Sequence, residues 1–115
     1  MRDIYADDDK HPLPKLGVID SKAAKKSGGV DLVLVIASPL DGEEISQKRL
    51  IRKVETYLYF AESEEHKTTY GAPTPNKTRI LVKVPKTSDP EIFELLENCK
   101  PWALENDVSL IVERT

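Results

Sequence analysis

The first half of the chain contains two short apolar runs separated by glycines. Residues 16–20 are apolar and rich in β-branched side chains, as is typical of an edge strand. Residues 30–37 are apolar at successive positions, so both faces should be covered and the strand should lie inside a sheet. Between the runs, Ser27-Gly28-Gly29 supplies the positive-φ residues that a tight reversal needs. The two runs therefore predict an antiparallel hairpin.

Two segments in the second half alternate between apolar and polar residues, which is the pattern of half-buried strands. In residues 79–84, the β-branched side chains share one face and Leu81 lies on the other. In residues 108–113, Ile111 lies opposite the remaining apolar side chains in the same way. Each segment therefore predicts a strand that buries one face and leaves an apolar side chain on the other.

Helical spacing of apolar residues begins at Asp41 and continues to about Glu64. The residues that share one helix face are Gln47, Leu50, Ile51, Val54, Leu58 and Ala61. Asp41 can accept hydrogen bonds from the first free amides, and Glu44 stands three residues later, as in a capping box. The basic residues of this helix fall mostly on the opposite side, where we expect them to be solvated.

A second helix is expected to start at Ser88 or Asp89, since either can cap it and Pro90 suits the first turn. Its buried stripe comprises Ile92, Leu95, Leu96, Cys99 and Ala103. Pro101 removes a hydrogen bond within this stretch, so the helix should bend or restart there.

These elements define the expected fold class and domain limits. The order β-β-α-β-α-β, with two helices on one face of a mixed sheet of about four strands, is an α+β fold: an α/β two-layer sandwich. Residues 64–78 are polar and contain Pro73 and Pro75, which predicts a long loop. Residues 1–15 combine a run of three Asp with two prolines, which predicts a flexible acidic tail. Residues 16–115 are then a single α/β domain.

The composition narrows the classes of function. The 115 residues include 17 Lys and Arg against 20 Asp and Glu, and a net charge of −3 argues against a dedicated nucleic-acid binder. No apolar run approaches the roughly 18 residues of a membrane span, and residues 1–5 lack the apolar core of a signal peptide. The single cysteine, Cys99, excludes an internal disulfide and fits a reducing compartment. We therefore expect a cytoplasmic protein.

Four short motifs occur in a characteristic order: Val18-Ile19-Asp20, residues 33–36, Ser38-Pro39-Leu40-Asp41 and Tyr57-Leu58. With these motifs, residues 16–114 resemble a family of short bacterial proteins known only as a domain of unknown function. Its members often place a Trp after the Leu-Asp step and a His a few residues later, where this chain has Gly42 and Ser46. The resemblance implies the hairpin and a bacterial cytoplasmic setting, but it implies no particular activity.

The residue types that carry catalysis or bind metals are scattered along the chain. A metal site needs a cluster of His, Cys and carboxylate ligands, whereas His11, His66 and Cys99 are far apart. His66 stands among glutamates that we interpret as a solvated helix end, and Cys99 lies on the buried stripe as a small hydrophobic residue. The loop at residues 38–42 has one glycine and no lysine for a phosphate. The sequence therefore predicts no enzymatic activity, no metal and no cofactor.

Protein binding has the most support among the classes of function. With both helices on one side, the other face of the sheet should carry Leu81 and Ile111, together with Val33 and Val35 from the central strand. These side chains need cover, which a homodimer, another protein or the folded-back tail would provide. Tyr70, in a proline-containing loop, is a second expected contact. We therefore expect a small non-enzymatic protein-interaction module, with a homodimer as one of its forms.

Two alternatives remain open at this point. A nucleic-acid-associated accessory protein would use the basic face of the first helix, formed by Lys48, Arg49, Arg52 and Lys53. An ordinary solvated face balanced by nearby acids is favoured over this function. A small-molecule binder would place its site at the carboxyl ends of the strands, near Ser38 and the 64–78 loop.

Overall fold

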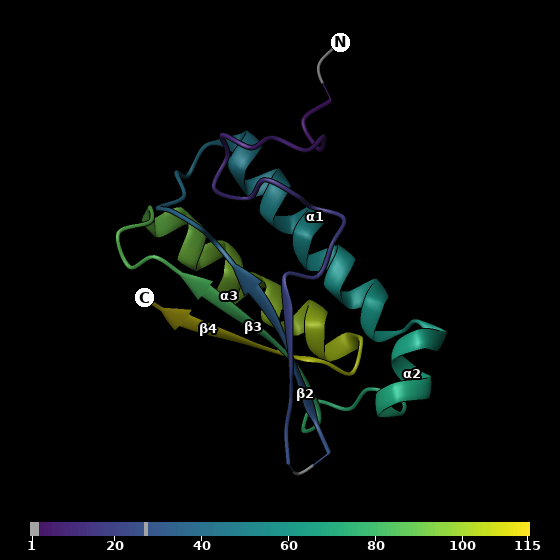
Figure 1. The fold of residues 1–115 in the computed structure, drawn as a ribbon. Coiled ribbons are helices and arrows are strands. Elements are labelled where there is room, and N and C mark those ends of the chain that lie inside the picture. The colour runs from purple at the N-terminus through teal and green to yellow at the C-terminus, as the bar shows by residue number, and fades with distance from the viewer. Residues whose placement is uncertain (1–2, 27) are drawn as a thin grey trace.

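A computed structural model describes residues 3–26 and 28–115 and contains one mixed sheet of four strands with three helices (Figure 1). Along the chain the elements are β1 (Ser21–Ala24), β2 (Val30–Val35), α1 (Glu44–Ala61), α2 (Glu64–Tyr70), β3 (Thr78–Val84), α3 (Pro90–Glu105) and β4 (Ser109–Arg114). The prediction of an α+β two-layer fold with a mixed four-stranded sheet is confirmed. The order differs by one additional helix, α2.

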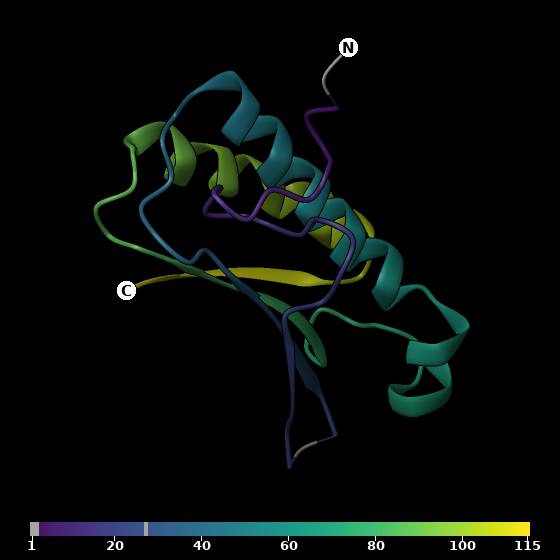
Figure 2. The ribbon, with the colours of Figure 1, turned by 45° about the horizontal axis from the view of Figure 1, so that its top comes forward.

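The strands follow one another across the sheet in the order β1-β2-β3-β4. β1 is antiparallel to β2, whereas β2, β3 and β4 are mutually parallel. Parallel neighbours require crossover connections, and crossovers of one hand put their helices on the same side of the sheet. α1 and α3 accordingly lie together on one face (Figure 2).

The core fills the space between the sheet and these helices. Alternate residues of β2 and β3 point into it, since every second residue of a strand lies on the same face: Val30, Leu32, Leu34, Ile80, Val82 and Val84. α1 contributes Leu50, Val54, Leu58 and Ala61 at helical spacing, as predicted. Tyr57, outside the predicted stripe, is fully buried, and Ile51 is exposed instead. The buried stripe is therefore rotated toward Tyr57.

The first strand begins later than its apolar pattern suggested. Residues 16–20 are not a strand, because the Asp20 amide donates to the Tyr57 hydroxyl and the chain leaves the sheet at that point. The exposed stretch Ser21–Ala24 forms β1 in their place. The hairpin itself is confirmed, with Gly28 at φ 93° in its turn. The predicted turn residue Ser27 lies outside the described residues.

The region predicted as a long loop contains α2. Ser63 caps this helix, since its side chain accepts a hydrogen bond from the His66 amide at 3.2 Å. Gly71, at φ 82°, ends it in a conformation that favours glycine. A serine followed by two acidic residues, with a glycine eight residues after the serine, was a usable helix signal that the prolines downstream obscured.

The N-terminal segment lies against the helix layer (Figure 2). Leu13 is fully buried and belongs to the core, and the Ala37 amide donates to the Pro12 carbonyl at 3.2 Å. The prediction of a flexible tail over residues 1–15 did not include a core residue, whereas Leu13 is one.

α3 starts at Pro90 and continues through Pro101 to Glu105, so the expected break is absent. Neither expected cap bonds to the amides of its own helix. The Ser88 hydroxyl accepts from the Leu40 amide at 3.0 Å, and an Asp89 carboxylate oxygen accepts from the Gly42 amide at 2.8 Å. These side chains tie the loop after β2 to the loop after β3. None of the helices in the described part of the chain is both long and apolar enough to cross a membrane.

Candidate interaction surface

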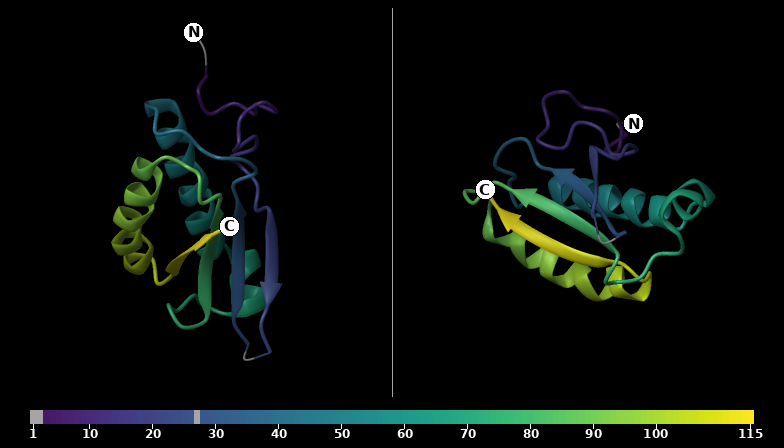
Figure 3. Two further views of the ribbon diagram at one scale, coloured as in Figure 1. Left: turned by 90° about the vertical axis from the view of Figure 1, so that its left-hand side faces the viewer. Right: turned by 60° about the horizontal axis from the view of Figure 1, so that its bottom comes forward.

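The sheet has one face without a helix over it, within residues 3–26 and 28–115 (Figures 2 and 3). In the register of the sheet, Val33 of β2 is aligned with Leu81 of β3, which is aligned with Ile111 of β4. Side chains aligned across neighbouring strands point to the same face. Val33, Leu81 and Ile111 therefore form one apolar row across the uncovered face, and we call it the apolar row.

Exposure along the apolar row increases toward β4. Val33 is buried by its neighbours, Leu81 is half-buried, and Ile111 is 39% exposed. Val35, on the same face and two residues further along β2, is 42% exposed. The structure thus brings together four of the five residues predicted for partner binding, and the two most exposed of them are Val35 on β2 and Ile111 on the outermost strand β4.

Charged groups flank the apolar row. On one side, Arg79 donates two hydrogen bonds of 2.8 Å to the Asp31 carboxylate, and Lys25 lies 3.1 Å from the same group. The hydrogen bonds from Arg79 lower the pKa of Asp31 below its ordinary value. On the other side, Lys83 is aligned with Glu113. The uncovered face therefore has an apolar centre with charges of both signs around it.

Tyr70, the fifth predicted contact, lies elsewhere. It is the last residue of α2, and its ring centroid is 5.0 Å from that of His66. The ring packs against the margin of the core rather than on the uncovered face.

The four basic residues of α1 divide into two pairs. Lys48 and Arg52 are at the surface, where they lie 2.8 Å from Glu44 and 3.6 Å from Glu55. Arg49 and Lys53 are each only 2% exposed. The expectation that these two project into solvent is wrong, and the basic face that a nucleic-acid site would need is reduced to Lys48 and Arg52, both paired with acids.

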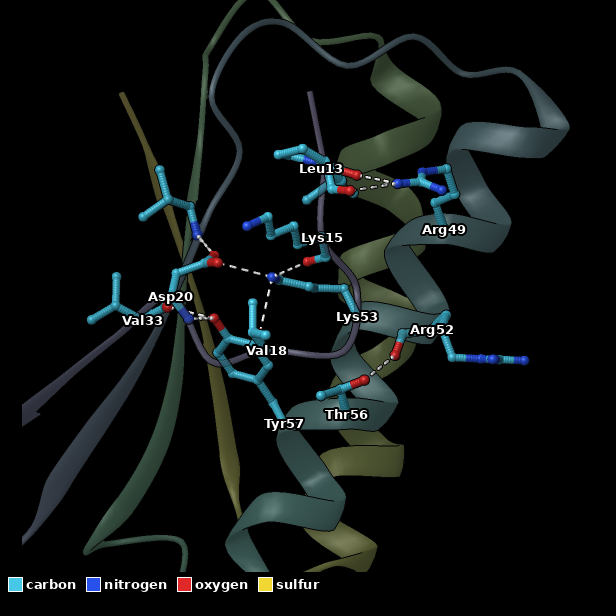
Figure 4. A network of polar contacts seen from close by, with 12 residues as sticks. Leu13, Lys15, Val18, Asp20, Val33, Arg49, Arg52, Lys53, Thr56 and Tyr57 are labelled. Carbon is cyan, nitrogen blue, oxygen red and sulfur yellow. Dashed lines mark hydrogen bonds and ion pairs between the residues drawn. The ribbon is translucent and has the colours of Figure 1, made fainter. Parts of the chain in front are cut away.

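Arg49 is buried because it binds the N-terminal segment. Its guanidinium donates to the carbonyl oxygens of Ile4 at 2.8 Å and Ala6 at 2.7 Å, and also to that of Leu13 (Figure 4). A guanidinium has five N–H donors in a fixed fork, so one side chain can donate hydrogen bonds to several backbone carbonyl oxygens. Arg49 therefore fixes a segment that has no secondary structure of its own.

Lys53 and Tyr57 form the second part of this buried network (Figure 4). The Lys53 ammonium donates to an Asp20 carboxylate oxygen at 2.8 Å, to the Val18 carbonyl at 3.0 Å and to the Lys15 carbonyl. The Tyr57 hydroxyl donates to the Val33 carbonyl at 2.6 Å and accepts from the Asp20 amide. Burial raises the pKa of Tyr57 above its ordinary value.

Asp20 also extends the sheet ladder just before β1 begins. Its second carboxylate oxygen accepts from the Val35 amide at 2.9 Å, a β2 group that a longer β1 would have paired. Arg49, Lys53 and Tyr57 stand four residues apart on α1. The sequence shows this spacing, but charged residues are rarely buried, and the pattern therefore predicts Arg49 and Lys53 on the solvated side.

His66 is almost completely buried, although it was expected at a solvated helix end. Its ring lies 5.4 Å from Phe60 and 5.0 Å from Tyr70, measured between centroids. Neither ring nitrogen has a hydrogen-bond partner among the residues that the structure describes. Burial lowers the pKa of His66. Cys99 is buried as predicted, and burial raises the pKa of its thiol.

The small-molecule site expected at the carboxyl ends of the strands is not formed by the predicted segments. Thr78 is aligned with Val30, so the residues that precede β3 lie at the amino ends of β2 and β3. Ser38 follows the carboxyl end of β2. The prediction that Ser38 and the 64–78 segment share a site is therefore wrong.

A cavity of about 310 Å³ lies between the N-terminal segment and the start of α1 and is lined partly by Asp3, Asp7 and His11. His11 Nε2 lies 3.2 Å from the hydroxyl of the buried Ser46, and burial together with Arg49 lowers the pKa of His11. Over the described ranges, no three His, Cys, Asp or Glu side chains are grouped so that they could hold a metal ion.

The fold and this surface define a small two-layer α+β protein with one uncovered sheet face. No family model matches the chain, and no curated protein or solved structure matches it either.

Proposed function

We propose that this chain is a non-enzymatic protein-interaction module of the bacterial cytoplasm that associates with a second copy of itself through its sheet. The observation that carries the proposal is the apolar row, which lies on the uncovered face and reaches its greatest exposure at Ile111 on an outermost strand. Apolar side chains gathered at a sheet edge are a common signature of a contact with another chain.

The charges around the apolar row support a contact between identical chains. Asp31 and Arg79 neutralise each other on one side, and Lys83 and Glu113 are aligned on the other. A surface that carries charges of both signs can meet a copy of itself with opposite charges facing each other. Closed symmetric dimers are also the commonest oligomers of soluble proteins.

Sedimentation analysis of the full chain from low to high micromolar concentration tests this proposal. We expect a monomer–dimer equilibrium that Ile111→Lys shifts toward the monomer by at least tenfold in the dissociation constant. Ile51→Lys is the matched control, because Ile51 on α1 is equally exposed at 39% but lies away from the sheet. A strict monomer at the highest concentration would overturn the proposal.

A further inference from the structure

The outer edge of β4 is free in the part of the chain that the structure describes, since β4 is the last strand of the sheet (Figure 3). Thr115, just after β4, donates to the Val84 carbonyl at 2.8 Å and accepts from the Lys86 amide at 2.9 Å. Because backbone groups of a strand alternate in direction, odd-numbered residues of β4 bond to β3. Leu110 and Val112 therefore direct their N–H and C=O groups outward.

The two edges of the sheet differ in how they are protected. β1 has four residues, all exposed, and contains Lys22. Short edge strands and edge lysines discourage pairing with another chain. β4 has six residues, and Leu110, Ile111 and Val112 follow one another without a charge or a proline. β4 is therefore the edge strand that is better suited to pairing with another chain.

Antiparallel pairing of β4 with itself has one favourable register. With Ile111 on the two-fold axis, Leu110 faces Val112 of the second copy, and both present free backbone groups. Ile111 then faces itself in a non-hydrogen-bonded pair, with the Cα atoms about 4.5 Å apart. A two-residue shift would set Ile111 against Ser109 or Glu113. Only the register centred on Ile111 joins the apolar rows of the two copies end to end.

The same register also matches charges across the junction. Ser109 would face Glu113 of the second copy, because both lie two residues from Ile111. Arg79 is aligned with Ser109, and Lys83 with Glu113. In the joined sheet, one row of aligned residues contains Asp31, Arg79 and Ser109 of the first copy. The row then continues with Glu113 and Lys83 of the second copy. Signs therefore alternate along this row, which favours the pairing.

The helix side of the edge is self-complementary as well. The Phe93 ring lies 4.0 Å from the Arg114 guanidinium carbon, which places Phe93 on the side of α3 beside β4. Leu104 follows about three helical turns later on the same side and is 53% exposed. Between them, Lys100 and Glu97 form an ion pair at 2.9 Å. An antiparallel α3 pair that sets Phe93 against Leu104 also sets Glu97 against Lys100.

The two-fold axes of the strand pair and the helix pair coincide. Phe93 lies beside Arg114, and the Val108 amide donates to the Ala103 carbonyl at 3.0 Å, so α3 runs antiparallel to β4. The midpoint between Val108 and Arg114 is Ile111. The corresponding midpoint on α3 is residue 98, next to the centre of the helix pair. One rotation therefore satisfies both contacts.

From this coincidence we propose that two copies pair along β4 in the antiparallel register centred on Ile111, with their α3 helices side by side. The proposal rests on the self-association proposed above and specifies its geometry. The result is one continuous sheet of two copies, in which the two apolar rows become a single surface.

Cysteine cross-linking under mild oxidation tests the register. Ile111→Cys should give a disulfide-linked dimer, since a non-hydrogen-bonded antiparallel pair meets the Cα spacing of a disulfide. Glu113→Cys, on the same strand and face, should not cross-link to itself. A mixture of the Glu113→Cys and Ser109→Cys chains should form the mixed dimer. The buried Cys99 is left in place in all of them.

Two substitutions separate edge pairing from stacking of the uncovered faces. Val112→Pro removes an outward N–H without touching the bonds to β3, so it should weaken the dimer at least tenfold. Val35→Lys should leave the edge dimer unchanged and would disrupt face-to-face stacking. Circular dichroism and thermal melts verify that each variant is folded, and Leu104→Glu, outside the sheet, should also weaken the dimer.

The outcomes distinguish the two proposals. A dimer that resists Val112→Pro and does not cross-link through Ile111→Cys overturns the edge geometry but leaves self-association intact. A dimer that Val35→Lys abolishes overturns the edge geometry in favour of stacked faces. A monomer at every concentration overturns both proposals.

Discussion

The Nζ atom of Lys53 lies 2.8 Å from Oδ1 of Asp20, and the lysine side chain is only 2% exposed. The pair links α1 to the residue at which the chain enters the sheet. The Lys53 ammonium also donates hydrogen bonds to the carbonyl oxygens of residues 15 and 18. A buried ammonium with this many partners is stable only while all of them are present, so the pair determines the path of the segment before β1.

Replacing Lys53 with Met should lower the free energy of unfolding by about 3 to 5 kcal/mol, since it leaves a carboxylate and two carbonyls without their buried partner. Urea unfolding monitored by circular dichroism measures the change. The control is Lys48→Met on the same helix, which breaks an exposed ion pair with Glu44 and should change stability little. Equal stability of the two variants would contradict the role assigned to Lys53.

Tyr57→Phe removes one hydroxyl that bridges the Asp20 amide and the Val33 carbonyl. The Asp20 amide then loses its partner and the Val33 carbonyl loses the bond from Tyr57, and we expect a loss of about 1 to 3 kcal/mol. Tyr59→Phe is the control, because Tyr59 is a highly exposed residue of the same helix. A Tyr57→Phe chain as stable as the Tyr59→Phe chain would show that the bridge contributes nothing.

Much of the fold could be predicted from the spacing of apolar residues, and the predictions that were wrong have physical reasons. Leu50, Val54 and Leu58 were placed correctly because apolar residues at helical spacing have one common cause, burial against a sheet. Arg49 and Lys53 were misplaced because their partners are carbonyl oxygens more than thirty residues away in the sequence. No local pattern reports such a partner.

The uncovered face was predicted more completely than the buried network. Leu81 and Ile111 could be assigned to it because a strand's alternation alone determines which side chains oppose the buried ones. The start of β1 could not be found in this way. Its residues are small or polar, and they form a strand because the turn at Gly28 sets their register against β2.

The burial of Leu13 predicts that the N-terminal segment contributes to stability. Leu13→Ala should cost about 2 to 5 kcal/mol, the range for emptying a buried leucine site. Val18→Ala, at an exposed position of the same segment, should change stability by less than about 0.5 kcal/mol. Hydrogen exchange gives a second measurement, since the amides of Asp8 and Ala37, bonded to Pro14 and Pro12, should be protected. Unprotected amides together with a neutral Leu13→Ala would support a mobile tail instead.

The burial of His66 predicts that the folded protein loses stability in mild acid. The groups that act on its charge are Lys22 of β1 and Glu62 at the end of α1, and burial, the largest effect, lowers its pKa from 6.5. The unfolded chain therefore binds a proton near that pH while the folded chain does not, so the free energy of unfolding falls as the pH drops below about 6.5. We expect the decrease between about pH 7.5 and about pH 5.5, measured by urea unfolding, to be smaller in His66→Phe than in the original chain. The pKa of His11 is also lowered, so His11→Gln is compared as the second histidine variant. An unchanged pH dependence in His66→Phe would mean that the buried ring accepts its proton without disturbing α2.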